Sequence, residues 1–237
     1  MATVVLVRHG RSTANTSGIL AGRLPGVELD ELGREQVARA GERLAGVPLA
    51  AVVTSPLERC RSTAAAVAAA QLTHPVPVEA IDDDLTECGY GDWQGRPLGE
   101  LAKEPLWRVV QQHPSAAVFP GGESLAGMQS RAVTAIRRLD RALEREHGGG
   151  AVWVAVSHGD VIKSVLADAL GMHLDLFQRI RVDPASVSIV RYGAERPEVL
   201  ATNTVGGDLS WLAAEKTAPG STVGGGAGPR AAHADPS

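Results

Sequence analysis

Short apolar segments that alternate with helical patterns are the feature that most constrains the fold of this chain. Residues 3–7 (TVVLV), 49–55 (LAAVVTS) and 151–157 (AVWVAVS) are rich in β-branched residues and predict buried strands. Helical patterns occupy the ranges 31–45, 55–71, 124–146 and 158–170. Strands that alternate with helices indicate an α/β fold, so we predict a single three-layer α/β/α domain with a mostly parallel central sheet.

The remaining segments complete this domain and mark its end. Prolines limit residues 74–81 to a possible edge strand, and residues 82–120 look like an excursion with one helix inside it. Residues 185–192 and 197–203 predict a late hairpin. The residues from about 213 onwards are rich in Gly, Ala and Pro, which predicts a disordered tail over 213–237 and a domain over 1–212.

Composition and charge restrict the classes of partner. The chain has 237 residues, 44% of them hydrophobic, and a net charge of −4, which argues against nucleic acid or an anionic membrane as the main partner. No apolar run approaches the ~20 residues of a membrane span, and the N-terminus lacks a signal-peptide pattern. We therefore expect a soluble cytoplasmic protein. The sequence is compatible with a homo-oligomer and does not specify one.

Polar side chains follow each of the three strong strands. The junctions read Arg8-His9-Gly10, Ser55 to Arg59 (with Ser55 as the expected helix N-cap and Pro56 first in the helix), and Ser157-His158-Gly159-Asp160. Ligands of open α/β sheets bind outside the carboxyl ends of the strands, so we expect the three junctions to converge. Two histidines and two arginines in one crevice predict a phosphoryl pocket, because guanidinium binds phosphate oxygens bidentately.

Each of these signals has a simpler interpretation when it is taken alone. A histidine at a strand end is commonly a satisfied polar residue, and Arg59 could be a solvated residue in the first turn of a helix. Two His-Gly dipeptides after strong strands, together with a capped helix that carries an arginine, favour the pocket.

Five motifs then point to a known family. They are LVRHGRSTAN (6–15), SPLERCRSTA (55–64), LTECGYGDWQG (85–95), PGGES (120–124) and VSHGD (156–160). In this order, over residues 3 to about 205, they resemble the histidine phosphatase superfamily, in its phosphoglycerate mutase-like branch. The resemblance implies that family's fold and a reaction through phosphohistidine.

The resemblance also implies roles for individual residues. His9 matches the nucleophile, and Arg8, Arg59 and His158 match the rest of the phosphate pocket. Glu87 matches the carboxylic acid that protonates the leaving oxygen. We assign the substrate-binding set to Ser12, Asn15, Arg11 and Gly159.

These roles agree with elementary chemistry. An imidazole nitrogen attacks phosphorus only when it is unprotonated, a form that is available near neutral pH. Its other nitrogen must then carry the proton, which a backbone carbonyl can hold. Arginines stabilise the charge of the transferring group, so we expect no metal and no cofactor, and a carboxyl with a raised pKa can protonate the alkoxide.

Two departures from the mutase pattern favour a phosphatase. The residue after His9-Gly10 is Arg11, where mutases of the family usually carry Glu, and residues 96–124, which follow the segment of Glu87, contain no Arg-Arg pair. We therefore predict a metal-independent phosphomonoesterase that acts on a small phosphorylated metabolite, with a phosphomutase as the alternative. Arg11 would favour a substrate with a second anionic group.

Two further alternatives remain at this point. Asp82-Asp83-Asp84-Leu85-Thr86 fits the Asp-x-Asp-x-Thr motif of Mg²⁺-dependent phosphatases with Asp82 as nucleophile. A degenerate member of the family could also bind a phosphorylated ligand without turnover. Cys60 and Cys88 are too few for a disulfide framework or zinc site; a weaker hypothesis brings them together at the pocket as a redox pair.

Overall fold

Strands and helices alternate along the part of the chain that the computed structural model describes, which is residues 2–73, 79–193, 195–207 and 209. The strands are β1 (Thr3–Arg8), β2 (Leu49–Thr54), β3 (Glu79–Ile81), β4 (Val152–Ser157), β5 (Val187–Tyr192) and β6 (Pro197–Thr204). The helices are α1 (Thr13–Ser17), α2 (Glu31–Leu44), α3 (Glu58–Ala69), α4 (Leu98–Leu101), α5 (Pro105–Gln112), α6 (Leu125–His147) and α7 (Gly159–Ala169). Short 3-10 helices are η1 (Asp83–Leu85), η2 (Gly91–Trp93), η3 (Pro114–Ala116) and η4 (Leu174–Arg179).

The strands form one six-stranded sheet in the order β3-β2-β4-β1-β5-β6. Strands β1, β4, β2 and β3 run parallel, while β5 is antiparallel to both β1 and β6. The predicted α/β fold with a mostly parallel sheet is confirmed, and so is the late hairpin. The proline-rich segment contributes only β3, at the sheet edge, and residues 74–78 lie outside the described part.

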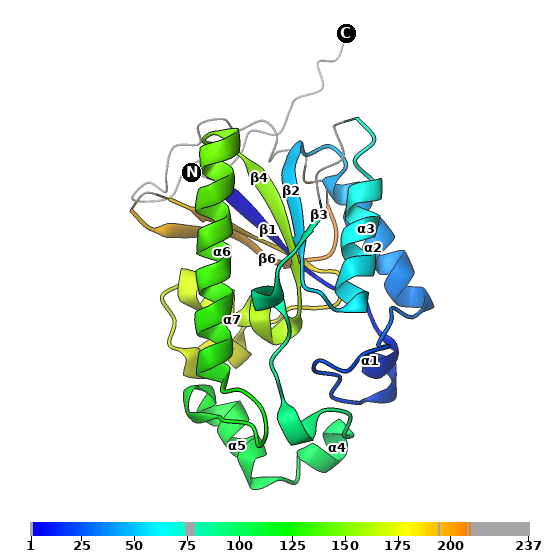
Figure 1. The fold of residues 1–237 in the computed structure, drawn as a ribbon, viewed down its shortest axis with the longest axis vertical. Coiled ribbons are helices and arrows are strands. Elements are labelled where there is room, and N and C mark those ends of the chain that lie inside the picture. Colours follow the sequence, from blue (N-terminus) through cyan, green and yellow to red (C-terminus); the bar gives the residue numbers. More distant parts are fainter. Residues whose placement is uncertain (1, 74–78, 194, 208, 210–237) are drawn as a thin grey trace.

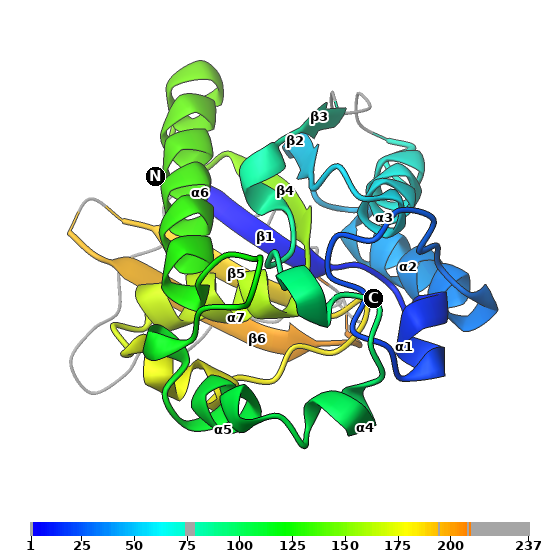
Figure 2. The same ribbon diagram turned by 60° about the horizontal axis from the view of Figure 1, so that its bottom comes forward.

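Helices cover both faces of the sheet, as Figures 1 and 2 show. Alternate residues of a strand point to opposite faces, and β1 follows this rule. Val4 and Leu6 belong to the apolar cluster that contains residues of α6 and α7. Val5 and Val7 belong to the cluster that contains residues of α2 and α3. The chain therefore has the predicted three layers, with β1 buried between two helical layers.

The segment between β3 and α6 differs from the prediction. It contains two helices, α4 and α5, where one was expected. Helix α4 spans only Leu98–Leu101, so it is too short to show a helical period in the sequence. Both helices lie with α1 beyond one end of the sheet (Figure 1), where they can form walls around the strand ends.

The described residues end soon after β6, so the predicted tail over 213–237 lies outside them and the domain boundary stays a prediction. No helix within the described ranges is long and apolar enough to cross a membrane.

Candidate active site

The three polar junctions meet because β2, β4 and β1 are neighbouring parallel strands. Arg8 ends β1, Ser55 follows β2, and His158 follows β4 and caps α7. Close backbone packing fixes the first junction: a Cβ on Gly10 would lie 2.5 Å from the carbonyl oxygen of Gly33 in α2. The polar residues that follow the three strands therefore lie close together at the carboxyl edge of the sheet, as the sequence predicted.

His9 lies where the three junctions meet, and its hydrogen bonds define the tautomer of its ring. Its side chain is buried, and Nδ1–H donates to the Gly10 carbonyl oxygen at 2.7 Å. Nε2 therefore carries the lone pair, and it accepts a hydrogen bond from Arg59 Nε at 3.3 Å. Burial, followed by the charges of Arg59 and Arg8, lowers the pKa of His9 well below its usual value. The ring is therefore neutral near pH 7.

His158 faces His9, with ring centroids 5.2 Å apart. Nδ1 of His158 accepts from Arg59 Nη2 at 3.2 Å, so Nε2–H donates to Ser55 Oγ at 2.8 Å. Burial and the nearby arginines lower the pKa of this ring as well. The predicted N-cap role of Ser55 is wrong: α3 begins at Glu58 after Leu57, and the Ser55 hydroxyl orients His158 instead.

Arg8 and Arg59 hold donors that have no partner in the described part of the chain. Arg59 is 2% exposed and Arg8 is half-buried; Arg8 Nε and Arg59 Nη1 are buried without a hydrogen bond. Other atoms of the same groups are satisfied, because Arg8 Nη1 donates to the Val182 carbonyl and Arg59 Nη2 to that of Gly22. A buried guanidinium N–H without an acceptor is costly, so these donors fit an anion.

Glu87 contributes a buried carboxyl to the same cavity. The residue is 9% exposed, and Oε1 accepts from Cys88 N at 2.9 Å. Burial, and after it the charge of Asp160, raises the pKa of Glu87 to about 7, although Arg59 and Arg8 oppose the shift. The carboxyl can therefore both give and take a proton near neutral pH.

Arg8, His9, Arg59 and Glu87 line a cavity of about 340 Å³, a size that suits a small molecule. His158, expected in the phosphate pocket, is fully buried and is not among the lining residues; it contacts the pocket through Arg59. Of the predicted substrate-binding set, Ser12, Asn15 and Gly159 line it too. The Ser12 hydroxyl and Asn15 Oδ1 are 2.9 Å apart, within the capping box of α1.

The prediction for Arg11 is corrected. Its side chain is 39% exposed and pairs with Asp30, Nε to Oδ2 at 2.6 Å, and it does not belong to the cavity lining. Asp30 is the N-cap of α2, so the Arg11 guanidinium is paired with this acidic cap.

Several lining residues were missed by sequence reasoning. Asp160 accepts from the Tyr90 hydroxyl at 2.8 Å and lies 3.3 Å from Lys163 Nζ. Asp160 directly follows His158-Gly159 and Tyr90 lies in the motif of Glu87, so position in a motif was an available signal. The remaining wall is largely apolar and aromatic, and its members include Ile19, Leu20, Trp93, Leu98, Trp107, Val110 and Phe119.

The structure does not support two other hypotheses from the sequence, namely Asp82 as nucleophile and Cys60 with Cys88 as a redox pair. Asp82 is not among its lining residues; Oδ1 accepts from Asp84 N in the cap of η1, and Oδ2 pairs with Arg138. Cys60 and Cys88 are both free and buried, and they belong to the apolar clusters of opposite sheet faces. Burial raises the pKa of both thiols, that of Cys60 to about 12, so neither is a reactive thiolate.

Comparisons with known proteins give the same family as the five sequence motifs. The family model of the histidine phosphatase superfamily (branch 1) matches residues 4–205. Bifunctional protein Rv2228c of Mycobacterium tuberculosis is 34% identical over 197 residues, which are 81% of this chain and 50% of that protein. The chain thus spans about half the length of this relative and of two other mycobacterial relatives.

Two further relatives are phosphatases by name. Phosphoserine phosphatase 1 of Hydrogenobacter thermophilus is 30% identical, and the match covers 86% of this chain and 92% of the relative. The solved structure of the mycobacterial glucosyl-3-phosphoglycerate phosphatase Rv2419c with VO3 has a TM-score of 0.75 and 25% identity, covering 85% of this chain and 99% of that one.

Proposed function

Because the chain belongs to the histidine phosphatase superfamily (branch 1), we propose that it is a metal-independent phosphomonoesterase that works through a phosphohistidine intermediate. Its substrate is a small phosphorylated metabolite. The observation that carries the proposal is neutral His9, with the Nε2 lone pair directed at a buried arginine, beside unpartnered donors on Arg8 and Arg59. A phosphoryl group satisfies those donors and presents its phosphorus to the nucleophile.

In the first step, His9 Nε2 attacks phosphorus while the bond to the ester oxygen breaks. Arg8 and Arg59 hold the non-bridging oxygens, where charge redistributes in the transition state, and His158 orients Arg59 through its Nδ1. Glu87 is protonated over a wide range up to about pH 7, and it gives its proton to the departing oxygen. The alcohol leaves neutral, and the phosphoryl group stays on His9.

In the second step, water attacks the phosphorus as the bond to Nε2 breaks. Glu87, now a carboxylate, takes the proton of that water, and inorganic phosphate leaves. Gly159 opens α7, whose first backbone N–H groups favour an anion at this end of the cavity. Ser12 and Asn15 offer hydrogen bonds to the phosphate or to the alcohol.

A phosphomutase is the second candidate, since the same phosphohistidine could return its group to a bound product. Residues 96–124 contain no Arg-Arg pair, and Asp30 neutralises Arg11, so the site has less of the basic charge that a carboxylate-bearing substrate requires. A Mg²⁺-dependent aspartyl phosphatase is disfavoured by the contacts of Asp82 with η1 and Arg138. A binding protein without turnover remains an outcome of the first experiment.

We expect phosphate release from phosphomonoesters to continue in excess EDTA. The panel contains phosphoserine, 3-phosphoglycerate with and without 2,3-bisphosphoglycerate, p-nitrophenyl phosphate and benzyl phosphate. Rates within about twofold of those without EDTA support a site whose cations are Arg8 and Arg59. Loss of release in EDTA, restored by Mg²⁺, would favour the aspartyl mechanism. Isomerised phosphoglycerate would identify a mutase, and binding without release a non-catalytic protein.

The cavity wall also indicates the character of the leaving alcohol. The lining also contains aromatic and aliphatic side chains, with Trp93 and Trp107 stacked at 6.2 Å between centroids. Apart from Arg8 and Arg59, the basic residue in the described lining is Lys163, which Asp160 neutralises at 3.3 Å. We infer an alcohol that is uncharged and in part apolar, such as an aryl or arylmethyl group.

This inference predicts a substrate order and a variant that changes it. Benzyl phosphate should exceed phosphoserine in kcat/KM by ~10-fold or more, because burial of a phenyl ring is worth about 2 kcal/mol. Trp107→Ala should lower kcat/KM for benzyl phosphate by ~10-fold and leave that for phosphoserine within ~2-fold. Steady-state kinetics on both esters check the order. An equal loss on both, or a wild-type preference for phosphoserine, would refute the apolar subsite.

A further inference from the structure

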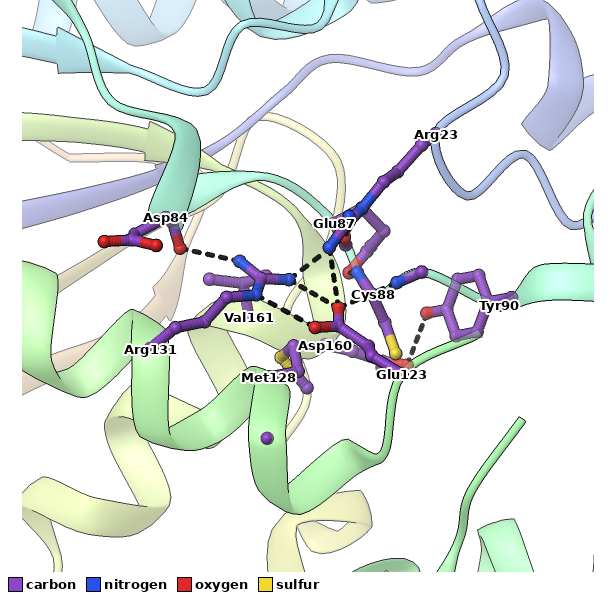
Figure 3. A network of polar contacts seen from close by, with 12 residues as sticks. Arg23, Asp84, Glu87, Cys88, Tyr90, Glu123, Met128, Arg131, Asp160 and Val161 are labelled. Atoms are coloured by element: carbon purple, nitrogen blue, oxygen red, sulfur yellow. Dashed lines mark hydrogen bonds and ion pairs between the residues drawn. The ribbon is translucent and has the colours of Figure 1, made fainter. Parts of the chain in front are cut away.

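The backbone carbonyl of Glu87 receives guanidinium donors from two distant parts of the chain. Arg23 Nε donates to it at 2.8 Å from the loop between α1 and α2, and Arg131 Nη2 donates at 3.1 Å from α6. Arg131 Nη1 also donates to the Asp84 carbonyl at 2.7 Å. Figure 3 shows these bonds converging on the segment that carries Glu87.

Glu123 joins the two arginines and holds the same segment. Its Oε1 lies 2.8 Å from Arg23 Nη2, 2.7 Å from Arg131 Nη2 and 2.8 Å from Gly89 N, and Oε2 accepts from Arg131 Nε at 3.1 Å. Burial raises the pKa of Glu123, but the hydrogen bonds of Arg131 and Gly89 outweigh it and lower that pKa. The carboxylate therefore stays charged and binds all its donors. We call Arg23, Glu123 and Arg131 the clamp.

The clamp contacts the backbone of Glu87, the proposed acid, and it is next in sequence to Gly22, which contacts Arg59 of the phosphate pocket. The Glu87 carboxyl accepts from the next amide, Cys88 N, so its position follows that of the clamped backbone. Gly22, next to Arg23, accepts from Arg59 Nη2 at 2.7 Å. Arg131 and Glu123 are well shielded, with side chains 18% and 23% exposed, which makes their pairing more effective than that of an exposed ion pair.

We propose that Glu123 and Arg131, assisted by Arg23, are positioning residues that place the Glu87 carboxyl for proton transfer to the leaving oxygen. This inference rests on the proposed function. Proton transfer requires hydrogen-bond distance between donor and leaving oxygen, and a misplacement of about 1 Å costs ~100-fold. None of the three residues lines the cavity, so a defect in the clamp should appear only where the acid is needed.

The leaving group provides the readout. Benzyl alkoxide must be protonated as it departs, whereas p-nitrophenolate is a stable anion and leaves without an acid. Both esters place an aromatic ring in the same cavity. We expect Arg131→Met and Glu123→Gln to lower kcat/KM for benzyl phosphate by ~10- to 100-fold and for p-nitrophenyl phosphate by less than ~3-fold. Arg131→Lys should recover part of the loss.

Arg137→Met is the matched control, because Arg137 lies on the same helix and pairs with Asp168 at 2.6 Å, away from the clamp. It should change neither ester by more than ~2-fold. If Arg131→Met does not fold, Glu123→Gln and Arg131→Lys carry the same test, and their p-nitrophenyl phosphate rates report an intact phosphate pocket.

Glu87→Gln, measured in parallel, separates the two hypotheses. If it is selective for benzyl phosphate but the clamp variants lower both esters equally, the clamp only supports the fold and the positioning inference is overturned. If Glu87→Gln itself shows no selectivity, the role of Glu87 as acid fails, and the positioning inference fails with it. Selectivity in all three variants supports the proposal.

Discussion

Replacement of His9 by alanine should lower phosphate release from every substrate by ~10⁴-fold or more, because the residue supplies the only bond to the transferring group. Arg8 and Arg59 remain in the variant, so we expect the phosphate still to bind. The expected signature is a collapse of kcat with little rise in the Kd of inorganic phosphate. Steady-state kinetics and a phosphate-binding titration check both halves of the prediction.

The covalent intermediate gives the same prediction a direct test. Wild-type protein mixed briefly with ³²P-labelled substrate should carry a label that is labile in acid and stable in alkali, as a phosphoramidate is, and His9→Ala should carry none. His113→Ala is the control, since that exposed histidine caps α5 outside the cavity. Retained turnover in His9→Ala would remove His9 as the nucleophile. A label stable in acid would point to an ester on another residue.

The parts of the site that could be predicted from sequence are those that follow strands. Arg8 ends β1, and His9 and His158 directly follow β1 and β4, which are parallel neighbours with the buried, β-branched sequences typical of such strands. The alternation of Val4 and Leu6 with Val5 and Val7 likewise follows from the strand period of two. The location of these three residues follows from their position after a strand, and the two-sided burial of β1 follows from the strand period.

The parts that could not be predicted depend on which side chains meet across loops. Glu123 and Arg131 are eight residues apart in sequence, and nothing local indicates that both reach the segment of Glu87. Arg11 was misjudged for the same reason, because its partner Asp30 comes from the cap of α2. Ser55 has the sequence of an N-cap, yet its hydroxyl binds His158. Tertiary contacts override a local preference at each of these positions.

Glu87→Gln should have the second largest effect, and it should depend on the leaving group. The amide keeps the size of the side chain but cannot donate an acidic proton. We expect kcat/KM for benzyl phosphate to fall by ~10²- to 10³-fold and that for p-nitrophenyl phosphate by less than ~10-fold. Steady-state kinetics with both esters at pH 6 measure the difference. Equal losses on the two esters would show that Glu87 shapes the pocket and does not act as an acid.

The pH profile tests the same role independently. Burial and Asp160 raise the pKa of Glu87 to about 7, so the protonated acid is present below that pH and is lost above it. Burial and the charges of Arg59 and Arg8 lower the pKa of His9 well below 6.5. The protonation of His9 therefore produces no change in kcat/KM near pH 7. For wild type, kcat/KM on benzyl phosphate should therefore fall as pH rises through about 7, whereas p-nitrophenyl phosphate should show no such fall.

Wild type and Glu87→Gln share the ionisation of the substrate phosphate, so comparing the two proteins on benzyl phosphate isolates the titration of the acid. Glu87→Gln should abolish the descending limb for benzyl phosphate. In the complex, the phosphate adds negative charge beside Glu87 and raises its pKa further, so the limb in kcat should lie at higher pH than the limb in kcat/KM. A descending limb that persists in Glu87→Gln would assign the titration to another group and remove Glu87 as its source.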